Sequence, residues 1–562
     1  MRDHLVMKLV VLVAVFATSW ALFTTHFFPL HDYVHVARIV QMAKSLIEGQ
    51  LPVRWSDLFG YGYGMPLFEF YGPLPYYLGA VLYLFNLPPL FVLRVLFIIC
   101  SALTAVGGYL LGKRVFNSNQ VAALSALAIT LAPYRSVNLY IRGAVGESWG
   151  IMAMPWVLWA ISGLWKQKKH SLIALTLSLS VLFLSHNLVT FIAAPFFGLW
   201  FIGYGWISTR SWQDWRRAFF QACAAVGLAV GLTAFYLFPA FLEKENTQVA
   251  LLFTNGYFDY HLHFLYLRQY LNPVWGYGGS EWGPQDKISF FLGWGQIAGL
   301  VLALSLIAKT LINRSVSKHK SIIQLVILSF GLAGVSLLMA TFKFQFIWDA
   351  TPLFTFVQFP WRYVSIGLVF IGLAAASSVV FIPSKYRNQA AIGLSLLMLL
   401  NGWYFRPEKY LDTPDGLYYT DQQRITTEMS GILPDFIPNT APASRADQPN
   451  LGVALVCQID NSCSFQEETL SLLGHQKLIS INPDQTYQVV FATNYFPGWS
   501  AEVNGKSVPL EMTENGLIGV TVPEGKHIVG IKFGSTPVRT VSDTTSLVSI
   551  FILVVIALMG LL

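Results

Sequence analysis

Long runs of apolar residues, interrupted by short polar stretches, make up most of the chain. The first run, Leu9 to Phe23, follows a basic N-terminus and is not followed by a small-residue cleavage site, so we expect an uncleaved helix with a cytoplasmic N-terminus. Further apolar runs occupy residues 91–112, 121–134, 151–165, 171–185, 188–207, 219–241, 288–309, 322–341, 361–381, 389–405 and 543–562. Because one crossing takes about 20 residues, the pattern predicts 12 or 13 transmembrane segments, with residues 74–87 either half-inserted or part of one bent span.

Basic residues gather in short clusters between these runs, and the clusters predict the topology. All of them fall on one side of the membrane if residues 74–112 contribute an odd number of crossings, and the positive-inside rule makes that side cytoplasmic. The clusters are Lys113/Arg114, Lys166 to His170, Arg210 to Arg217, Lys309 to Lys320 and Lys385 to Arg387. The outer face then carries the polar stretches 26–73, 135–150, 242–287 and 342–360 together with the polar region 406–540.

The region 406–540 has a different period. Short alternating runs at 487–493, 500–503, 518–522 and 527–533 are separated by Asn-Gly and Pro-Glu-Gly turns, which are strand and hairpin signals. The sequence therefore predicts an α-helical polytopic membrane protein with three parts. These are a transmembrane domain (1–405), an extracytoplasmic antiparallel β-sandwich (406–540) and a C-terminal transmembrane helix (541–562).

Composition narrows the class further. The 562 residues are 54% hydrophobic and only 12% charged, against about 25% charged in soluble proteins. This excludes a soluble enzyme, a disordered chain and a disulfide-stapled secreted module. The net charge of +7 comes from the topology clusters, so we expect the lipid bilayer, and no nucleic acid, as the partner of these residues.

The four cysteines give no metal signal. Cys100 and Cys223 lie in apolar runs, where we expect inert packing, and no Cys/His cluster has structural zinc spacing. Cys457 and Cys463 lie in the polar region, and either a small-loop disulfide or two free thiols fits their spacing.

The first outer stretch carries the strongest candidate chemistry. Asp32 has His31 beside it and His35 three residues on, and apolar positions at helical spacing then predict an amphipathic helix that lies on the membrane and runs to Glu48. Asp32 is either the N-cap of that helix or a carboxylate poised for chemistry at the membrane exit.

An aromatic and glycine-rich segment follows, from Gly60 to Tyr77. Its glycines let a backbone approach a ligand closely, and its rings, Tyr71 among them, are typical both of sugar binding and of interfacial belts. Glu69 adds an acid on the same face. We rank it below Asp32 because a single loop glutamate is usually solvated.

These motifs resemble a known family. The His-Asp pair, the helix that ends in Gly-x-x-Pro, the segment 60–77, Tyr134 to Glu147 and Gln358 to Tyr363 resemble bacterial membrane proteins labelled 6-pyruvoyl-tetrahydropterin synthase-related. That group is similar to the GT-C superfamily of membrane glycosyltransferases. Residues 494–499 resemble the outer β-domain of YfhO-type membrane proteins. No pterin-enzyme zinc site is visible, so the family label gives no guide to the chemistry.

The resemblance implies a GT-C-like transmembrane domain and a role for Asp32. In GT-C enzymes an acidic residue of the first outer loop serves as general base or orients the substrate. At Asp32 such a base would take the proton of an acceptor hydroxyl as it attacks an anomeric carbon whose leaving group is a polyprenyl phosphate. One carboxylate suffices for this direct inverting displacement, and inversion itself rests on the superfamily analogy.

The leaving phosphate needs cations. Arg142 and Arg362 each open a predicted span at its outer end, and Arg268 lies in the third outer stretch, so each is a candidate for phosphate binding or for snorkelling to lipid headgroups. Glu147, five residues after Arg142, indicates a structural ion pair or a wall of the site.

Further candidates for substrate contact come from several stretches. His186 ends an apolar run, where a buried histidine satisfied by a neighbouring span is the alternative. The remaining residues of this class are His31, His35, Tyr71 and Trp361. Asp259, His261 and His263 are close enough in sequence to be weighed as metal ligands, but no Asp-x-Asp pair occurs in the early outer stretches, so we expect no metal or other cofactor.

Together these features predict a membrane glycosyltransferase on the outer face of a bacterial cytoplasmic membrane. It would transfer sugar from a polyprenyl-phosphate-linked donor to an envelope glycan, lipid or protein. A lipid-linked glycan transporter is the first alternative, but it predicts ionisable residues along a path through the bilayer rather than near one face. A non-catalytic envelope scaffold is the second, and it would leave Asp32 replaceable.

Overall fold

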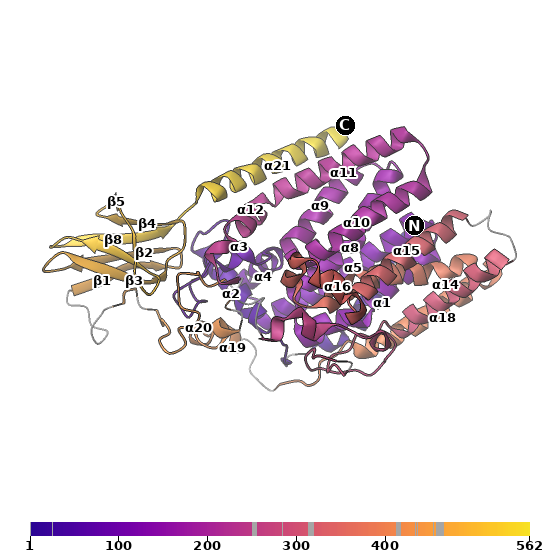
Figure 1. Cartoon of the computed structure of the whole chain (residues 1–562), viewed down its shortest axis with the longest axis horizontal. Coiled ribbons are helices and arrows are strands. Elements are labelled where there is room, and N and C mark those ends of the chain that lie inside the picture. Colours follow the sequence, from indigo (N-terminus) through magenta and orange to yellow (C-terminus); the bar gives the residue numbers. More distant parts are fainter. Residues whose placement is uncertain are drawn as a thin grey trace.

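The computed structural model has a helical body with β-strands at one end (Figure 1). It describes residues 2–24, 26–249, 256–283, 285–312, 320–411, 417–432, 434, 436–452, 454–456 and 466–561. Cys457 and Cys463, and with them the disulfide question, lie outside the described residues. The main helices of the body are α1 (Arg2–Ser19), α2 (Val34–Ile47), α3 (Leu67–Phe70), α4 (Leu74–Leu84), α5 (Pro89–Phe116), α6 (Asn119–Thr130), α8 (Val145–Trp165), α9 (Ser171–Ser185), α10 (Asn187–Ser208), α11 (Trp212–Leu232), α12 (Ala234–Leu242), α14 (Trp294–Ile312), α15 (Lys320–Met339), α17 (Val364–Ser377), α18 (Ser384–Leu399) and α21 (Pro537–Leu561).

Many of these helices are suited to a bilayer. Within the described ranges, seven stretches are long and apolar enough to cross a membrane: His4–Leu22, Pro89–Phe116, Asn187–Ser208, Trp294–Ile312, Lys320–Met339, Pro360–Phe381 and Pro537–Met559. The pair α11 and α12 passes the same test as one span bent by 76°, while α4, α6 and α9 are shorter apolar helices. The protein is therefore a polytopic helical membrane protein, and the 74–87 segment contains the 11-residue helix α4.

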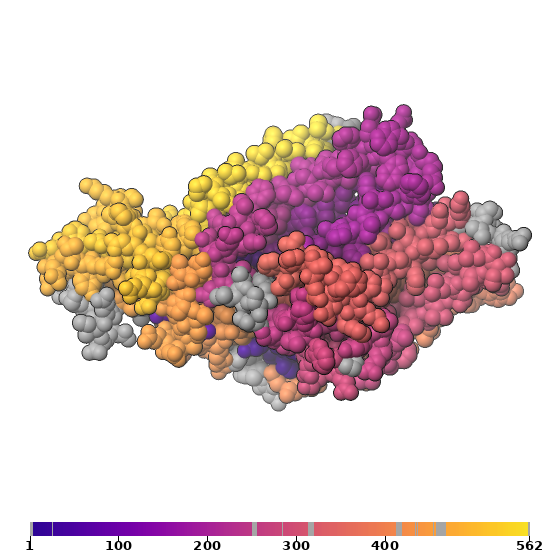
Figure 2. All heavy atoms as spheres, in the orientation of Figure 1, coloured from indigo at the N-terminus to yellow at the C-terminus, as the bar shows by residue number. Residues whose placement is uncertain are grey.

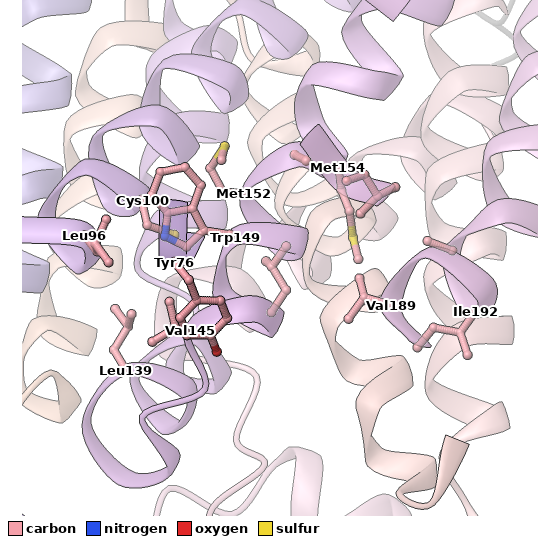
Figure 3. Packing of buried hydrophobic residues seen from close by; sticks show 14 of the residues in the cluster. Tyr76, Leu96, Cys100, Leu139, Val145, Trp149, Met152, Met154, Val189 and Ile192 are labelled. Carbon is pink, nitrogen blue, oxygen red and sulfur yellow. The ribbon is translucent and has the colours of Figure 1, made fainter. Parts of the chain in front are cut away.

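Close helix contacts build the core of the body. A side chain at Gly107 of α5 would come within 2.6 Å of the Trp156 ring of α8, and one at Gly112 would come within 2.5 Å of Ser125 of α6. Small residues permit such close approach, which membrane helices use in place of a hydrophobic driving force. Figure 3 shows the resulting packing, where α4, α5, α8 and α10 contribute Tyr76, Leu96, Cys100, Val145, Trp149, Met152, Met154, Val189 and Ile192.

The predicted helix after Asp32 is confirmed as α2, but it is more buried than a helix lying on a membrane. Its apolar stripe packs on α4 and α5, and the short helix α19 (Leu417–Thr420) also packs against it. As a result even His35, Arg38 and Gln41 are buried.

The predicted β-sandwich is also confirmed. A five-stranded sheet has the order β1-β2-β8-β4-β5 and a three-stranded sheet the order β3-β7-β6, with every pairing antiparallel. The strands are β1 (Gln466–Leu473), β2 (Gln476–Asn482), β3 (Tyr487–Asn494), β4 (Trp499–Val503), β5 (Lys506–Val508), β6 (Glu511–Met512), β7 (Leu517–Val522) and β8 (His527–Phe533). The turn between β4 and β5 has positive φ at both Asn504 and Gly505, as a two-residue hairpin requires.

The glycine-rich loop of the first outer stretch contacts the β-domain directly. Asn450 donates its backbone N–H to the Tyr61 carbonyl at 2.9 Å, and the Asn494 side chain donates to the Gly64 carbonyl at 2.9 Å. A Cβ at Gly62 would lie 2.0 Å from the Asn450 carbonyl oxygen. The glycines thus allow close approach of the β-domain, and not of a ligand as the sequence suggested.

Helix α21 leads back from the β-domain along the outside of the body. It packs on α11 and α12 (Figures 1 and 2). At its start Arg539 is fully buried and contacts Glu69 of α3 and Glu243 at the end of α12.

Basic loops meet at the end of the body away from the β-domain. Arg114 donates to the Trp159 carbonyl at 3.0 Å, Lys166 donates to the Arg114 carbonyl, and Gln167 donates to Asp214 at 3.1 Å. The tips of α14 and α15 also point to this end (Figure 1). The grouping agrees with the sequence-based separation of basic loops from outer loops.

Candidate functional site

Asp32 lies just before α2 and does not cap it. The N-cap residue of α2 is Tyr33, and no side-chain hydrogen bond caps the helix. The backbone N–H groups of His31 and Asp32 donate to the Ile141 and Arg142 carbonyls at 2.9 and 2.8 Å. The half-buried Asp32 carboxylate is therefore held beside Arg142 by the backbone and is free of the capping role.

Arg142 ends an unusual turn. Residues Val137–Arg142 form a π-helical turn (η2), a conformation that is rare and frequent at functional sites. Gly143 follows with φ of 70°, the left-handed region that favours glycine, and a Cβ there would lie 2.8 Å from Leu30. The turn thus brings Arg142 next to the His31-Asp32 segment.

Glu147 joins the two arginines. Its Oε2 accepts a hydrogen bond from Arg142 Nη1 at 2.6 Å and lies 3.5 Å from Arg362 Nε, and its Oε1 accepts from the Tyr134 hydroxyl at 2.7 Å. Asn138, one turn before Arg142, accepts from the same Nη1 at 2.6 Å. Two guanidinium groups therefore share one internal carboxylate.

Arg362 is fixed from its own side of the site. Its Nη1 donates to the Val357 carbonyl at 2.5 Å and to Gln358 Oε1 at 3.1 Å. Aromatic rings support both guanidinium groups, since Arg142 lies 4.7 Å from the centre of the Trp361 ring and Arg362 lies 4.9 Å from that of Phe359. Such planar, stacked guanidiniums suit bidentate recognition of phosphate.

Residues of α2 and the following loop form the wall behind Asp32. The Arg38 guanidinium lies 4.2 Å from the centre of the Tyr71 ring, and the Tyr76 hydroxyl hydrogen-bonds His35 Nδ1 at 2.7 Å. Burial, followed by the charges of Arg38 and Arg142, lowers the pKa of His35 well below its usual value. His35 is therefore neutral at pH 7 and adds no charge to the site.

His186 has a local structural role as well. Its Nδ1 accepts a hydrogen bond from the Val189 N–H at 3.2 Å, so the ring caps the start of α10. The ring lies close enough to Glu147 and Arg362 to interact electrostatically with both. The alternative considered from the sequence was a buried histidine satisfied by a neighbouring span, whereas His186 is half-buried and its partner is the helix that it begins. Contact with substrate stays a prediction.

Two of the candidates lie elsewhere. Arg268 is exposed on a short 3-10 turn, Leu267–Tyr270 (η6), in the third outer stretch. Glu69 is not a solvated loop glutamate. It is buried with Arg539, at 3.0 Å between Oε2 and Nε, and with Arg54 at 3.9 Å. The structure brings neither residue into the group around Asp32.

The site also contains residues that sequence reasoning did not assign. Tyr134 and Asn138 both bind Glu147, and Arg38 covers Tyr71. The only signal for Asn138 is its position four residues before Arg142. Nothing in the pattern separates Arg38 from an ordinary polar residue of an amphipathic helix.

The three residues considered as metal ligands, Asp259, His261 and His263, do not form one group. His261 pairs with Asp259 at 2.6 Å and with Asp349 at 3.2 Å, while His263 hydrogen-bonds Ser280 at 3.0 Å and the Tyr257 carbonyl. In the described part of the chain no group of three or more His, Cys, Asp or Glu residues could hold a metal ion.

Several solved structures resemble the fold weakly. The apo oligosaccharyltransferase of Archaeoglobus fulgidus has 15% identity and a TM-score of 0.42 over 75% of this chain and 60% of that one. The arabinofuranosyltransferase AftD from Mycobacteria has 15% identity and a TM-score of 0.40, over 74% and 28%. ArnT from Cupriavidus metallidurans, bound to undecaprenyl phosphate, has 14% identity and a TM-score of 0.37, over 75% and 77%. The chain thus spans less than two thirds of the first two proteins.

Sequence comparison is more decisive about the family. No curated protein matches the chain. A family model described as 6-pyruvoyl-tetrahydropterin synthase related domain, membrane protein, matches residues 68–406. The match covers more than half of the chain, includes Arg142, Glu147 and Arg362, and begins after Asp32. The chain therefore belongs to the 6-pyruvoyl-tetrahydropterin synthase related family of membrane proteins.

Proposed function

We propose that the protein is an inverting membrane glycosyltransferase. It takes a sugar from a polyprenyl-phosphate-linked donor and transfers it to a cell-envelope acceptor on the outer face of a bacterial cytoplasmic membrane. One observation carries the proposal. The Asp32 carboxylate has no capping role and lies beside Arg142, which shares the carboxylate of Glu147 with a second guanidinium group, that of Arg362.

The reaction follows from this division of charge. The Asp32 carboxylate accepts the proton of the acceptor hydroxyl as the hydroxyl oxygen attacks the anomeric carbon. The bond from that carbon to the phosphate oxygen breaks, and the polyprenyl phosphate leaves with the electron pair. Once Asp32 has taken the proton it is neutral, and the two positive charges of Arg142 and Arg362 then exceed the one negative charge of Glu147 and stabilise the added negative charge of the phosphate.

The chemistry of the leaving group explains why one carboxylate is enough for this reaction. A phosphate leaves as a stabilised anion, so it needs no general acid of the kind that an alkoxide leaving group needs. A single displacement from the face opposite the phosphate inverts the anomeric configuration. Tyr71 and Trp361 would pack against the sugar and the acceptor, as aromatic rings do.

The two alternative functions predict a different placement of, or need for, charged residues. A transporter of lipid-linked glycans needs polar or charged groups along its path, whereas Asp32, Arg142, Glu147 and Arg362 lie together in one cluster. A scaffold needs neither Asp32 nor the arginines. The clustering favours an enzyme.

Sugar transfer by the purified full-length protein in lipid vesicles tests the proposal. The substrates are radiolabelled polyprenyl-phosphate sugars and extracted envelope acceptors, and the variant is Asp32→Asn. We expect transfer by the wild type and a fall of at least ~100-fold in the variant, the size of a general-base contribution. Asp349→Asn, the same change at an exposed outer carboxylate, is the matched control and should keep the wild-type rate.

Each other outcome has a defined meaning. An Asp32→Asn rate equal to that of the wild type would keep the enzyme class and refute the site. Movement of labelled lipid across the vesicle membrane without transfer would favour the transporter.

A further inference from the structure

A cavity of about 390 Å³ opens in the third outer stretch, next to the Asp32 segment. Aromatic and hydrogen-bonding side chains share its lining, which includes Gln269, Asn272, Trp275, Tyr277, Asp286 and Phe290. Its volume lies within the range of small-ligand sites, roughly 300–1,000 Å³.

Two walls of the cavity reach the candidate site. The Tyr277 carbonyl is hydrogen-bonded to His31 Nε2 at 3.0 Å, and His31 directly precedes Asp32. On another side the Phe290 ring lies 5.8 Å from the Trp361 ring, which supports the Arg142 guanidinium. The cavity therefore adjoins the candidate site on two sides, through His31 next to Asp32 and through Trp361 next to Arg142.

The polar part of the lining is held in place before any ligand binds. Asp286 Oδ2 accepts from the Gln269 side chain at 2.6 Å, and Oδ1 accepts from the Glu281 N–H at 2.7 Å. The Gln269 amide oxygen in turn accepts from the Tyr266 N–H at 2.6 Å. Each carboxylate oxygen keeps further lone-pair capacity for a hydroxyl donor.

The aromatic part is fixed as well. The Trp275 ring packs on Tyr404 at 4.7 Å between ring centres, and the Tyr277 hydroxyl donates to the Arg406 carbonyl at 3.3 Å. Rigid ring faces beside a carboxylate and two amides match a sugar ring, which has an apolar C–H face and hydroxyls at its edge. Lys287 also belongs to the lining and pairs with Glu281 at 2.7 Å, so the one carboxylate and the one ammonium group of the lining leave it without net charge, which suits a neutral ligand.

We propose that this cavity binds a neutral sugar ring at the end of the acceptor, so that the acceptor is a glycan or a glycosylated lipid. The inference rests on the proposed function and narrows its substrate class. The acceptor assignment follows from exposure. Val274 on the lining is 71% exposed, so the cavity opens at the protein surface, whereas the guanidiniums that receive the lipid phosphate are buried. We therefore assign the open cavity to the acceptor and the buried arginines to the lipid-linked donor.

Saturation-transfer NMR on the full-length protein in nanodiscs tests the inference. It measures the binding of methyl glycosides of glucose, mannose, galactose, arabinose and N-acetylglucosamine. We expect saturable binding of at least one glycoside to the wild type and a dissociation constant at least 10-fold higher in Asp286→Asn, about the worth of a charged hydrogen bond. Asp259→Asn, the same change in the same loop but outside the cavity lining, should bind as the wild type does.

A second variant and a second ligand guard against misfolding. Asn272→Ala changes only the rim, and it should weaken the same glycoside by about threefold, the loss of one neutral hydrogen bond. Undecaprenyl phosphate, the ligand proposed for Arg142 and Arg362, should raise the melting temperature of both variants as much as that of the wild type.

Three results would overturn the inference. The first is no glycoside binding to the wild type, and the second is unchanged binding in both cavity variants. The third is displacement of the glycoside by a polyprenyl-phosphate sugar but not by undecaprenyl phosphate, which would assign the cavity to the donor sugar. Because binding is measured without turnover, glycoside binding by a protein that transfers no sugar would refute the proposed function and leave the cavity assignment standing.

Discussion

Arg539, near the start of the C-terminal helix, forms a buried ion pair with Glu69 of the first outer stretch, at 3.0 Å between Nε and Oε2. Both side chains are fully buried, and the two residues are 470 positions apart in sequence. Arg539 Nη2 also lies 2.8 Å from Glu243 Oε2 at the end of α12. This one side chain joins the helix that follows the β-domain to the loop that leads into the candidate site.

We expect Arg539→Leu to destabilise the protein strongly. Removal of one partner leaves Glu69 and Glu243 as buried carboxylates without their main counter-charge, which costs about 3–5 kcal/mol in buried pairs. Thermal unfolding in detergent should show a clear fall in melting temperature. Arg424→Leu removes an exposed pair with Asp421 at 3.8 Å and should change the free energy of unfolding by only about 0–1 kcal/mol. Equal losses in the two variants would contradict this account.

Glu147→Gln should produce a defect that a phosphate lipid repairs. Glutamine keeps a hydrogen-bond acceptor for Arg142 and removes the charge, so two like charges remain buried together and the free energy of unfolding should fall by about 3 kcal/mol. Undecaprenyl phosphate supplies the missing negative charge, and it should raise the melting temperature of the variant more than that of the wild type.

The control for this experiment is Glu281→Gln, an exposed carboxylate paired with Lys287 at 2.7 Å. Its melting temperature and its response to the lipid should match those of the wild type. The same lipid-induced shift in the Glu147 variant and in the wild type would show that the arginines do not receive the phosphate.

Local patterns predicted much of the fold and of the site. The turn at Asn504 and Gly505 needs only positive φ at two neighbouring positions, so sequence alone indicates the hairpin. Arg142 and Glu147 are five residues apart, and the π-helical turn and Gly143 bring them into the contact that their spacing suggested.

Contacts between distant segments could not be predicted in this way. The glycine loop suggested a ligand because close approach of a backbone is all that glycine indicates, whereas the partner proved to be Asn450 and Asn494 of the β-domain. Glu69 was expected to be solvated, but Arg539 buries it from 470 positions away. Periodicity carries no information about such partners.

Lys477 gives the β-domain an unusual dependence on pH. Its side chain is buried in the sandwich and donates to the Ala492 carbonyl at 2.8 Å, and burial lowers its pKa from 10.5 to about 8. Between pH 8 and 10.5 the unfolded chain holds a proton that the folded chain has lost, so the free energy of unfolding should rise with pH across this window. Below pH 8 both states are protonated and the full cost of the buried charge, about 3 kcal/mol, is present.

Lys477→Met should therefore stabilise the protein at pH 7, by about 1–3 kcal/mol, and should remove the rise between pH 8 and 10.5. Unfolding curves of the full-length protein at several pH values measure both effects. The control is Lys532→Met, an exposed lysine on the adjacent strand β8, which should keep the wild-type pH profile. A Lys477 variant less stable than the wild type at pH 7 would show that the hydrogen bond to Ala492 outweighs the cost of burial.

The cavity beside Asp32 should bind sugar less well in acid. Burial raises the pKa of Asp286 to about 6, so its carboxylate is ionised at pH 7 and accepts hydroxyl hydrogen bonds with its full charge. Below pH 6 the protonated form dominates, and the dissociation constant of the glycoside should rise up to tenfold for each further unit of pH. Asp286→Asn should bind weakly at every pH between 5 and 8 because it has no proton to gain, whereas Asp259→Asn should keep the wild-type profile. A wild-type affinity that stays constant from pH 8 to pH 5 would show that the carboxylate of Asp286 does not face the ligand.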